Sequence, residues 1–208
     1  INLLKKEGIT FVTSTEIGKD ISADEIVKSN DAVCVCIGAE VPRNLSIEGR
    51  ELKGVHFALE LLSQQNQILE GKTFGKDELI NAKGKKVLII GGGDTGSDCI
   101  GTSVRQGAIS VTQIEILPKP PVHDNPATPW PMYPQVLKTT SSHEEGCERR
   151  WNINSCRFIG ENGQLKAVEI EEVSWEKGEN GRMSMIPSGK KEIVEADLAF
   201  LAMGFVHP

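Results

Sequence analysis

The stretch KKVLIIGGGDTGSDCIGTSVRQGA, residues 85–108, decides the fold that we expect for this chain. Its aliphatic run, residues 87–90, has the composition of a buried strand, and three consecutive glycines follow it. Residues 94–106 have the pattern of a helix that ends at Gly107, a suitable C-cap. The next run, residues 110–117, alternates and is rich in β-branched side chains, which predicts a second strand. The stretch therefore predicts a βαβ unit within an α/β protein.

The glycines have the spacing Gly91-x-Gly93-x-x-Gly96, which is typical of a Rossmann-like dinucleotide-binding unit. Gly91 permits the tight turn, Gly93 lets the backbone approach a pyrophosphate, and Gly96 lets the helix pack closely on the sheet. The N–H groups at the start of the helix then face the phosphates. The candidate cofactor-binding residues here are Gly91, Gly92, Gly93, Asp94, Thr95 and Gly96. Two alternatives remain open: a purely structural turn, and Asp94 as a helix cap rather than a neighbour of the cofactor.

An acid, Glu115, lies about 24 residues after the first glycine, Gly91, and near the end of the second strand. A carboxylate there accepts hydrogen bonds from the ribose hydroxyls of an adenosine and repels a 2′-phosphate. Ile116 and Leu117 follow it, without an arginine that could pair with such a phosphate, and Lys119 is the only cation nearby in the sequence. We therefore expect NAD(H) to be favoured over NADP(H). The alternative is that Glu115 is a solvent-facing strand residue.

Composition and charge exclude several functions. The formal net charge of −6 is opposite to that of a nucleic-acid-binding surface. No apolar run approaches the roughly 20 residues that span a bilayer, and the first residues do not resemble a signal peptide. We therefore expect a cytoplasmic protein without nucleic-acid or membrane partners. The chain has no initiator methionine, so we expect it to be part of a longer protein.

Cysteines and histidines are not interpreted as catalytic or metal-binding groups. The odd count of five cysteines indicates a reducing compartment. Cys34 and Cys36 alternate in a predicted buried strand and are expected to be small core residues, as is Cys99. His123 and His143 are expected to be polar surface residues. We assign no catalytic acid or base, because hydride transfer between cofactors needs none, and no metal site.

Outside the central stretch, weaker patterns predict the remaining elements. Residues 9–15 and 31–39 predict strands, Ser22 with Glu25 predicts a capped helix start, and residues 55–69 predict a helix. Seven of the ten prolines lie in residues 118–134, which predicts an irregular loop whose Trp130 and Tyr133 cover the cofactor, meet a partner or pin the loop to the sheet. From residue 152 onward, turns at 162–163 and 180–181 predict a β-meander, and residues 196–205 a last buried strand.

Four segments carry a resemblance to a known family. GGGDTGSDCIGTSVRQGA, VTQIEILPKPP, PWPMYPQV and ADLAFLAMGF closely resemble the NAD(P)H-binding region of the small (beta) subunit of glutamate synthase. They are equally similar to the C-terminal region of single-chain NADH-dependent glutamate synthases. The upstream block DAVCVCIGAEVPRNLSIEGRELKGVHFALELL also matches, so the resemblance covers essentially the whole chain.

The resemblance implies a two-dinucleotide-binding flavoprotein, in which an NAD(P)H domain is inserted into an FAD domain. Residues 1–50 are then a partial FAD-domain segment, 51–200 the NAD(P)H-binding domain, and 201–208 the return towards the FAD domain. Gly38, Ala39 and Gly204 are the implied cofactor-binding residues at these junctions. The implied function is hydride transfer from NAD(P)H to FAD. Electrons then pass through iron–sulfur clusters outside this chain to the glutamate synthase large subunit or domain, which makes glutamate from glutamine and 2-oxoglutarate.

Two departures from the family pattern matter. The family's FAD fingerprint and its cysteine-rich cluster-binding region are absent from these residues, so we expect the chain alone to be inactive. Two other functions stay open. The chain could be the NAD(P)H domain of another FAD-dependent reductase, or a non-catalytic module for nucleotide binding or subunit interaction.

Overall fold

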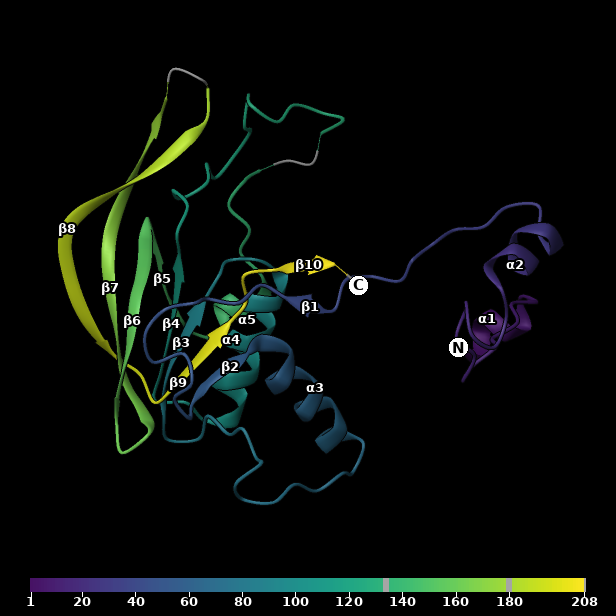
Figure 1. Cartoon of the computed structure of the whole chain (residues 1–208), viewed down its shortest axis with the longest axis horizontal. Helices are drawn as coiled ribbons and strands as arrows, with labels where there is room; N and C mark the ends of the chain where they lie inside the picture. Colours follow the sequence, from purple (N-terminus) through teal and green to yellow (C-terminus); the bar gives the residue numbers. More distant parts are fainter. Residues whose placement is uncertain (133–134, 179–180, 208) are drawn as a thin grey trace. The chain divides into compact units, whose positions relative to one another are not determined.

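The protein is described by a computed structural model that covers residues 1–132, 135–178 and 181–207. The chain divides into two compact units, residues 1–38 and residues 39–207. In the first unit, helix α1 spans Asn2–Lys6 and helix α2 spans Ala23–Ser29 (Figure 1). The hydroxyl of Ser22 accepts a hydrogen bond from the Glu25 N–H at 3.1 Å, which confirms the predicted start of α2.

The two strands predicted in the first 39 residues are wrong. Residues 9–15 and 31–39 have no strand structure, and Val35 and Ile37 are about 70% exposed. Cys34 and Cys36 are exposed too, with their sulfurs 3.4 Å apart, so they are not core residues here. A strand exists only where a neighbouring backbone pairs with its N–H and C=O groups, and no described residue provides that neighbour.

A five-stranded parallel sheet forms the centre of the second unit. Its order is β2 (Val55–Phe57), β9 (Leu198–Leu201), β3 (Lys86–Ile90), β4 (Ser110–Glu115) and β5 (Glu148–Trp151). The predicted strands around the glycine turn are confirmed, although β4 ends two residues earlier than expected. β2 occupies the first three residues of the predicted helix because they pair with β9. β5 was not predicted, since its sequence ERRW has no apolar alternation.

Helices cover one face of this sheet. Helix α3 spans Ala58–Leu69, and α4 spans Asp94–Gln106, the range predicted from the sequence. Gly107 ends α4 in the left-handed conformation, with φ of 91°. A short helix, α5 (Ser141–Glu144), follows the proline-rich loop, whose described residues contain no helix or strand.

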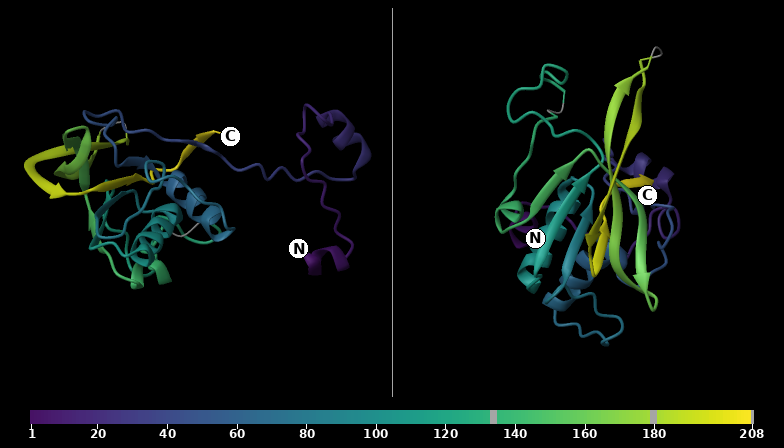
Figure 2. Two further views of the ribbon diagram at one scale, coloured as in Figure 1. Left: turned by 90° about the horizontal axis from the view of Figure 1, so that it is seen from below. Right: turned by 90° about the vertical axis from the view of Figure 1, so that its left-hand side faces the viewer.

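A three-stranded antiparallel meander covers the other face (Figures 1 and 2). It consists of β6 (Ile153–Glu161), β7 (Gln164–Lys177) and β8 (Met183–Glu195). The turn between β6 and β7 lies at Asn162 and Gly163, both with positive φ, which confirms the prediction there. The second predicted turn, at residues 180–181, lies partly outside the described residues.

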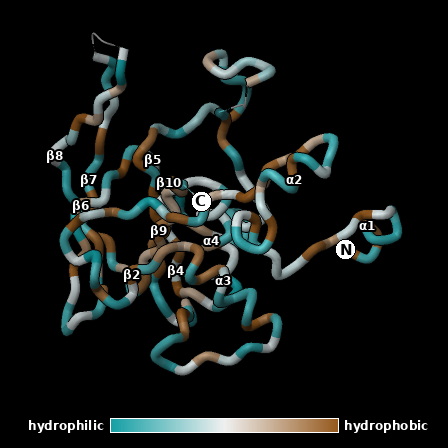
Figure 3. Tube along the Cα trace, turned by 45° about the vertical axis from the view of Figure 1, so that its right-hand side comes forward, coloured by the Kyte–Doolittle hydropathy of each residue, from teal (hydrophilic) through white to brown (hydrophobic). Residues whose placement is uncertain are grey.

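Alternation along β3 connects the three layers. Val87 and Ile89 face the helices and pack in one core cluster with Leu61, Cys99 and Ile100. Leu88 and Ile90 face the meander and pack with residues such as Phe158, Val168 and Ile170. The central strands are thus buried on both faces, as their continuous apolar sequence requires, and β9 is brown in the hydropathy colours of Figure 3.

The two ends of the second unit meet in a short antiparallel ribbon. β1 (Val41–Pro42) pairs with β10 (Phe205–His207), so the predicted last strand is divided into β9 and β10. The segment that leaves β1 and the segment that leaves β9 are also joined by the Arg43 N–H, which donates to the Gly204 carbonyl at 2.9 Å. Both segments therefore lie beside the carboxyl ends of the central strands.

Candidate functional site

The glycine turn connects β3 to α4 at the carboxyl edge of the parallel sheet. Gly91 has φ of 120°, and a Cβ atom at this position would lie 2.2 Å from the carbonyl oxygen of Ala202. A Cβ at Gly96 would lie 2.6 Å from the carbonyl oxygen of Gly91. Gly91 is therefore required by the turn and by the close segment after β9, and Gly96 by the close approach of α4.

Above the turn lies a cavity of about 560 Å³, which we call the glycine-turn cavity. Its volume falls within the range of small-molecule sites. Gly91, Gly92, Gly93, Glu115 and Gly204 line it, together with residues from the ends of β3 and β4, the start of β6 and the segments after β1 and β9: Arg43, Leu45, Ile90, Ile114, Ile116, Leu117, Ile153, Asn154, Ser155, Ala202 and Met203. In open parallel sheets, ligands bind at this edge.

Gly93 is the position at which the cavity reaches the start of α4. A Cβ there would meet no heavy atom within 4 Å, so the absence of a side chain is not needed for packing. Gly93 is also the N-cap of α4 and offers no side-chain acceptor to the first turn. Open space at this glycine and unsatisfied N–H groups beside it fit a phosphate group of a dinucleotide.

Asp94 and Thr95 lie in the first turn of α4. Asp94 is the first helical residue and is exposed, so it does not cap the helix, which was one of its two interpretations. Thr95 lies on the side of a smaller pocket near Phe57 and Phe205 rather than in the glycine-turn cavity. The two side chains therefore do not line the main cavity, although their backbone begins the helix beneath it.

Glu115 ends β4 directly beside the turn. A Cβ at Gly92 would lie 1.8 Å from the Glu115 carboxyl carbon, so the second glycine makes room for this carboxylate. The Glu115 side chain is 19% exposed, and Arg149 approaches it with Nη2 at 3.7 Å from Oε1. Burial raises the pKa of the carboxyl group, and the charge of Arg149 acts in the opposite direction. Glu115 is thus a partly buried acid at the cavity wall and not a solvent-facing strand residue.

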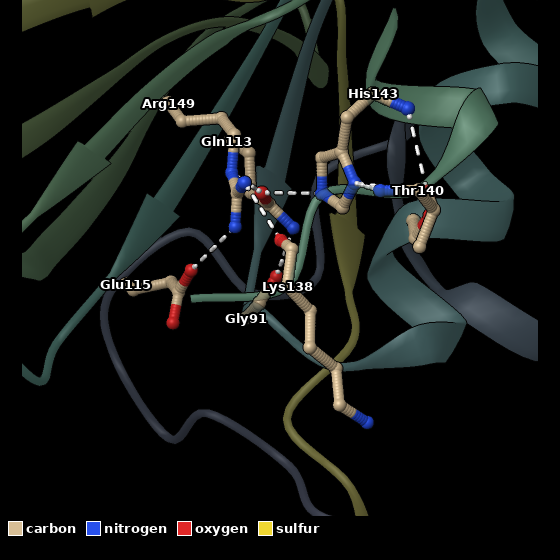
Figure 4. Close-up of polar contacts among 8 residues, drawn as sticks. Gly91, Gln113, Glu115, Lys138, Thr140, His143 and Arg149 are labelled. Carbon is tan, nitrogen blue, oxygen red and sulfur yellow. Dashed lines mark hydrogen bonds and ion pairs between the residues drawn. The ribbon is translucent and has the colours of Figure 1, made fainter. Parts of the chain in front are cut away.

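A hydrogen-bonded network next to Glu115 consists of Gln113, Thr140, His143 and Arg149 (Figure 4). The Thr140 N–H donates to His143 Nδ1 at 3.1 Å, so the proton of the neutral imidazole is on Nε2. Nε2 lies 3.3 Å from Gln113 Oε1, which also accepts a hydrogen bond from Arg149 Nε at 3.1 Å. The Gln113 amide then donates to the Gly91 carbonyl at 3.0 Å. The network connects α5 and β5 to the glycine turn.

His143 is buried, which corrects the expectation of a surface residue. Residues 140–143 form a capping box at α5, and this box turns the imidazole inward to the fully buried Gln113. Burial, and then the charge of Arg149, lowers the pKa of His143. His123 is exposed, as expected. Trp130 is 92% exposed and does not pin its loop to the sheet, whereas Tyr133 lies outside the described residues.

Cys99 is fully buried in the core, as predicted, and burial raises the pKa of its thiol to about 12. Among residues 1–132, 135–178 and 181–207, no group of three or more His, Cys, Asp or Glu side chains could hold a metal ion. In the same ranges, no helix has the length and apolar character needed to cross a membrane.

The structure brings most, not all, of the predicted site residues together. Gly38 and Ala39 are exposed, lie at the boundary of the two compact units and do not line the glycine-turn cavity. Sequence reasoning missed Arg43, Arg149 and Ser155. The Ser155 side chain is buried at the cavity wall, and its hydroxyl has no hydrogen-bond partner in the described part of the chain. Arg149 does not line the cavity but lies beside Glu115. No sequence signal marks Ser155 or Arg149, because strand pairing positions both.

Arg149 also changes the picture of the cations near Glu115. Lys119 is the only cation near Glu115 in the sequence, but in space Arg149 lies beside the carboxylate from the neighbouring strand. Lys119 instead lies with its Nζ 4.9 Å from the centre of the Trp151 ring. The absence of an arginine directly after Glu115 therefore does not mean that the site lacks one.

Comparisons with known proteins agree with this geometry. The chain is 45% identical to the NADH glutamate synthase of Saccharomyces cerevisiae over 218 aligned residues, which cover 100% of the chain and 10% of that protein. It is 44% identical to the NADPH glutamate synthase small chain of Mycobacterium tuberculosis, with 100% of the chain and 42% of that protein covered. The chain thus spans less than half the length of these relatives, and the resemblance stated from the sequence is confirmed.

The fold has counterparts among solved structures. FprA of Mycobacterium tuberculosis in complex with NADPH superimposes with a TM-score of 0.57 at 14% identity, covering 92% of this chain and 54% of that one. The expected α/β fold is therefore confirmed. The family model of pyridine nucleotide-disulphide oxidoreductases matches residues 1–207. The chain belongs to the pyridine nucleotide-disulphide oxidoreductase family.

Proposed function

We propose that this chain is the NAD(P)H-binding part of a flavin oxidoreductase that passes a hydride from NAD(P)H to FAD and so supplies electrons for glutamate synthesis. One observation carries the proposal: the glycine-turn cavity combines an open Gly93 at a helix start with a carboxylate, Glu115, at the end of the next strand. A dinucleotide needs both, because one part binds the pyrophosphate and the other the adenosine ribose.

The residues of the cavity fit NAD(P)H in defined roles. The N–H groups at the start of α4, next to Gly92 and Gly93, would bind the pyrophosphate. Glu115 would accept hydrogen bonds from the ribose hydroxyls, which favours NADH over NADPH because its charge repels a 2′-phosphate. NAD(P)H supplies the hydride when bound, and the residues of this chain hold and orient it.

The remaining parts of the proposal come from the relatives. Proteins named NADH glutamate synthase and NADPH glutamate synthase small chain match the whole chain. We propose that Gly38, Ala39 and Gly204 border the FAD-binding part, within the boundaries 1–50, 51–200 and 201–208. We also propose a large subunit or fused domain as the partner, iron–sulfur clusters outside these residues, and a cytoplasmic location.

Titration of the purified chain with NADH and NADPH tests the nucleotide site. We expect both to bind, NADH more tightly, and we expect Glu115→Ala to weaken NADH binding by about tenfold, the usual loss of hydrogen bonds to a charged acceptor. Glu161→Ala, at the exposed last residue of β6, removes the same group from a position that does not line the cavity and is the matched control. The nucleotide site is wrong if neither nucleotide binds, or if both variants bind NADH equally well.

A second measurement tests the reaction. In the longer protein that contains this chain, NADH should bleach the visible absorbance of bound FAD, and Gly93→Ala should slow the bleaching. Glutamine and 2-oxoglutarate should then yield glutamate in the presence of the large subunit or domain. Flavin reduction without glutamate formation would favour another FAD-dependent reductase, and nucleotide binding without flavin reduction would favour a non-catalytic module.

A further inference from the structure

Arg149 is placed beside the candidate ribose-binding acid by strand pairing. β5 runs parallel to β4. Arg149 pairs with Gln113, and Trp151 pairs with Glu115. The Arg149 side chain is 13% exposed, and its Nη2 lies 3.7 Å from Glu115 Oε1. Figure 4 shows the guanidinium between Gln113 and Glu115, with Nη2 towards the carboxylate. A cation therefore lies beside the carboxylate that would bind the ribose hydroxyls, just outside the residues that line the cavity.

The guanidinium is held in this position by contacts that do not involve Glu115. Nε donates to Gln113 Oε1 at 3.1 Å, and Nη1 donates to the Lys138 carbonyl at 3.0 Å. The guanidinium carbon also lies 5.1 Å from the centre of the Trp151 ring. Gln113 is fully buried and is itself bound to the Gly91 carbonyl at 3.0 Å. Arg149 is thus oriented before any ligand arrives, which reduces the ordering cost of binding.

The contact between Arg149 and Glu115 leaves room for a ligand. At 3.7 Å, Nη2 and Oε1 form an ion pair but are too far apart for a normal hydrogen bond. The Nη2 group can therefore donate to a phosphate oxygen without giving up a short hydrogen bond to Glu115. Phosphate is also the anion that a planar guanidinium binds well, through its parallel N–H groups.

Neighbouring cations do not have this arrangement. Arg150 projects to the other face of β5 and makes two hydrogen bonds with Glu192 on β8, at 3.1 and 2.6 Å. The exposed Lys119 lies over the ring of Trp151. Of these three cations, Arg149 has its guanidinium next to the Glu115 carboxylate.

We propose that Arg149 is a specificity-determining residue that binds the 2′-phosphate of NADPH, so that a site whose Glu115 carboxylate selects NADH still accepts NADPH. This proposal rests on the proposed nucleotide site. Glu115 and Arg149 then act on the same ligand position with opposite preferences. Removing Glu115 should relax the preference for NADH, and removing Arg149 should sharpen it.

The test compares dissociation constants of NADH and NADPH for the unsubstituted chain, Arg149→Gln and the matched control Arg150→Gln, which removes the same charge from the opposite face of the strand. In Arg149→Gln we expect the ratio of the NADPH to the NADH constant to rise about tenfold, the usual effect of losing a charged hydrogen bond. In Arg150→Gln the ratio should stay within about twofold, because Arg150 bonds to Glu192 on β8 and does not contact Glu115.

The outcomes separate the inference from the proposed function. An unchanged ratio in Arg149→Gln, or an equal loss for both nucleotides, overturns the role of Arg149 and leaves the nucleotide site intact. Binding of neither nucleotide to the unsubstituted chain overturns both. If thermal unfolding shows that Arg149→Gln does not fold, Arg149→Met decides: it keeps an apolar stem of similar length but removes the charge, so a clearly raised ratio supports the inference and an unchanged ratio overturns it.

Discussion

Gly93→Ala should weaken nucleotide binding while leaving the stability of the fold nearly unchanged. Gly91→Ala should instead lower the stability of the fold. The two positions are two residues apart in the same turn but have different surroundings. A Cβ at Gly93 meets nothing within 4 Å, and the backbone there, with φ of −79° and ψ of −175°, is open to any residue. A Cβ at Gly91 lies 2.2 Å from the Ala202 carbonyl oxygen at φ of 120°.

The structure gives the size of each effect. In Gly93→Ala, alanine is a weaker N-cap than glycine, which lowers the free energy of unfolding, but it also makes the unfolded chain less flexible, which raises it. Because the two contributions are similar in size, the free energy of unfolding should change by less than about 1 kcal/mol. For Gly91→Ala, positive φ costs about 1–3 kcal/mol and the backbone shift away from Ala202 about as much again. The total of about 2–6 kcal/mol lowers Tm by about 4–24 °C in a chain of this size.

Two measurements on both variants check this reasoning. Thermal unfolding followed by circular dichroism should show a Tm for Gly93→Ala within about 4 °C of the unsubstituted chain. Fluorescence titration with NADH should show binding at least about tenfold weaker, because the added methyl group occupies space that the pyrophosphate needs. The reasoning is refuted if Gly93→Ala binds NADH normally, or if Gly91→Ala unfolds at the same temperature as the unsubstituted chain.

Four further predictions concern the network and the cavity wall. Gln113→Leu should lower the free energy of unfolding in urea by about 2–4 kcal/mol, because a buried carbonyl and a guanidinium lose their partner. Stability should fall as the pH drops below about 6.5, because the pKa of His143 is lowered in the folded state and the unfolded chain then binds more protons; His143→Gln should reduce this dependence. The preference for NADH over NADPH should weaken as the pH falls, because burial raises the pKa of Glu115, so that it gains a proton at a higher pH than an ordinary carboxyl group and its repulsion of the 2′-phosphate is lost. Ser155→Ala should leave Tm within about 2 °C and weaken NADH binding, because the buried hydroxyl lines the cavity and has no hydrogen-bond partner among the described residues.

Controls separate each of these effects from general ones. The 2′-phosphate of NADPH also titrates near pH 6, so Glu115→Gln serves as the reference in which only the phosphate changes charge. An equal pH dependence in both proteins would contradict the role of Glu115. Three other results would each contradict the contact on which the prediction depends. These are an unaltered pH dependence of stability in His143→Gln, normal stability of Gln113→Leu, and normal NADH binding by Ser155→Ala.

How well the sequence predicted an element depended on how local its interactions are. The boundaries of α4 were predicted because its glycine turn and its C-cap, Gly107, are short-range features. The turn at Asn162 and Gly163 was predicted for the same reason. Residues 9–15 and 31–39 have strand-like composition, but pairing with a distant strand decides whether such residues form one. β5 has little apolar character, and its pairing with β4 makes it a strand.

The sequence by itself determined the βαβ unit, the glycine turn and the acid after the second strand, because φ, ψ and Cβ sterics act between residues close together in the chain. Only the tertiary structure decided that Arg149 lies beside Glu115, that His143 is buried against Gln113, and that Ser155 faces the cavity. These residues come from strands and a helix that meet by parallel pairing and by packing of the meander on the sheet. Contacts of that kind depend on the register of the strands, which the order of residues along a single strand does not reveal.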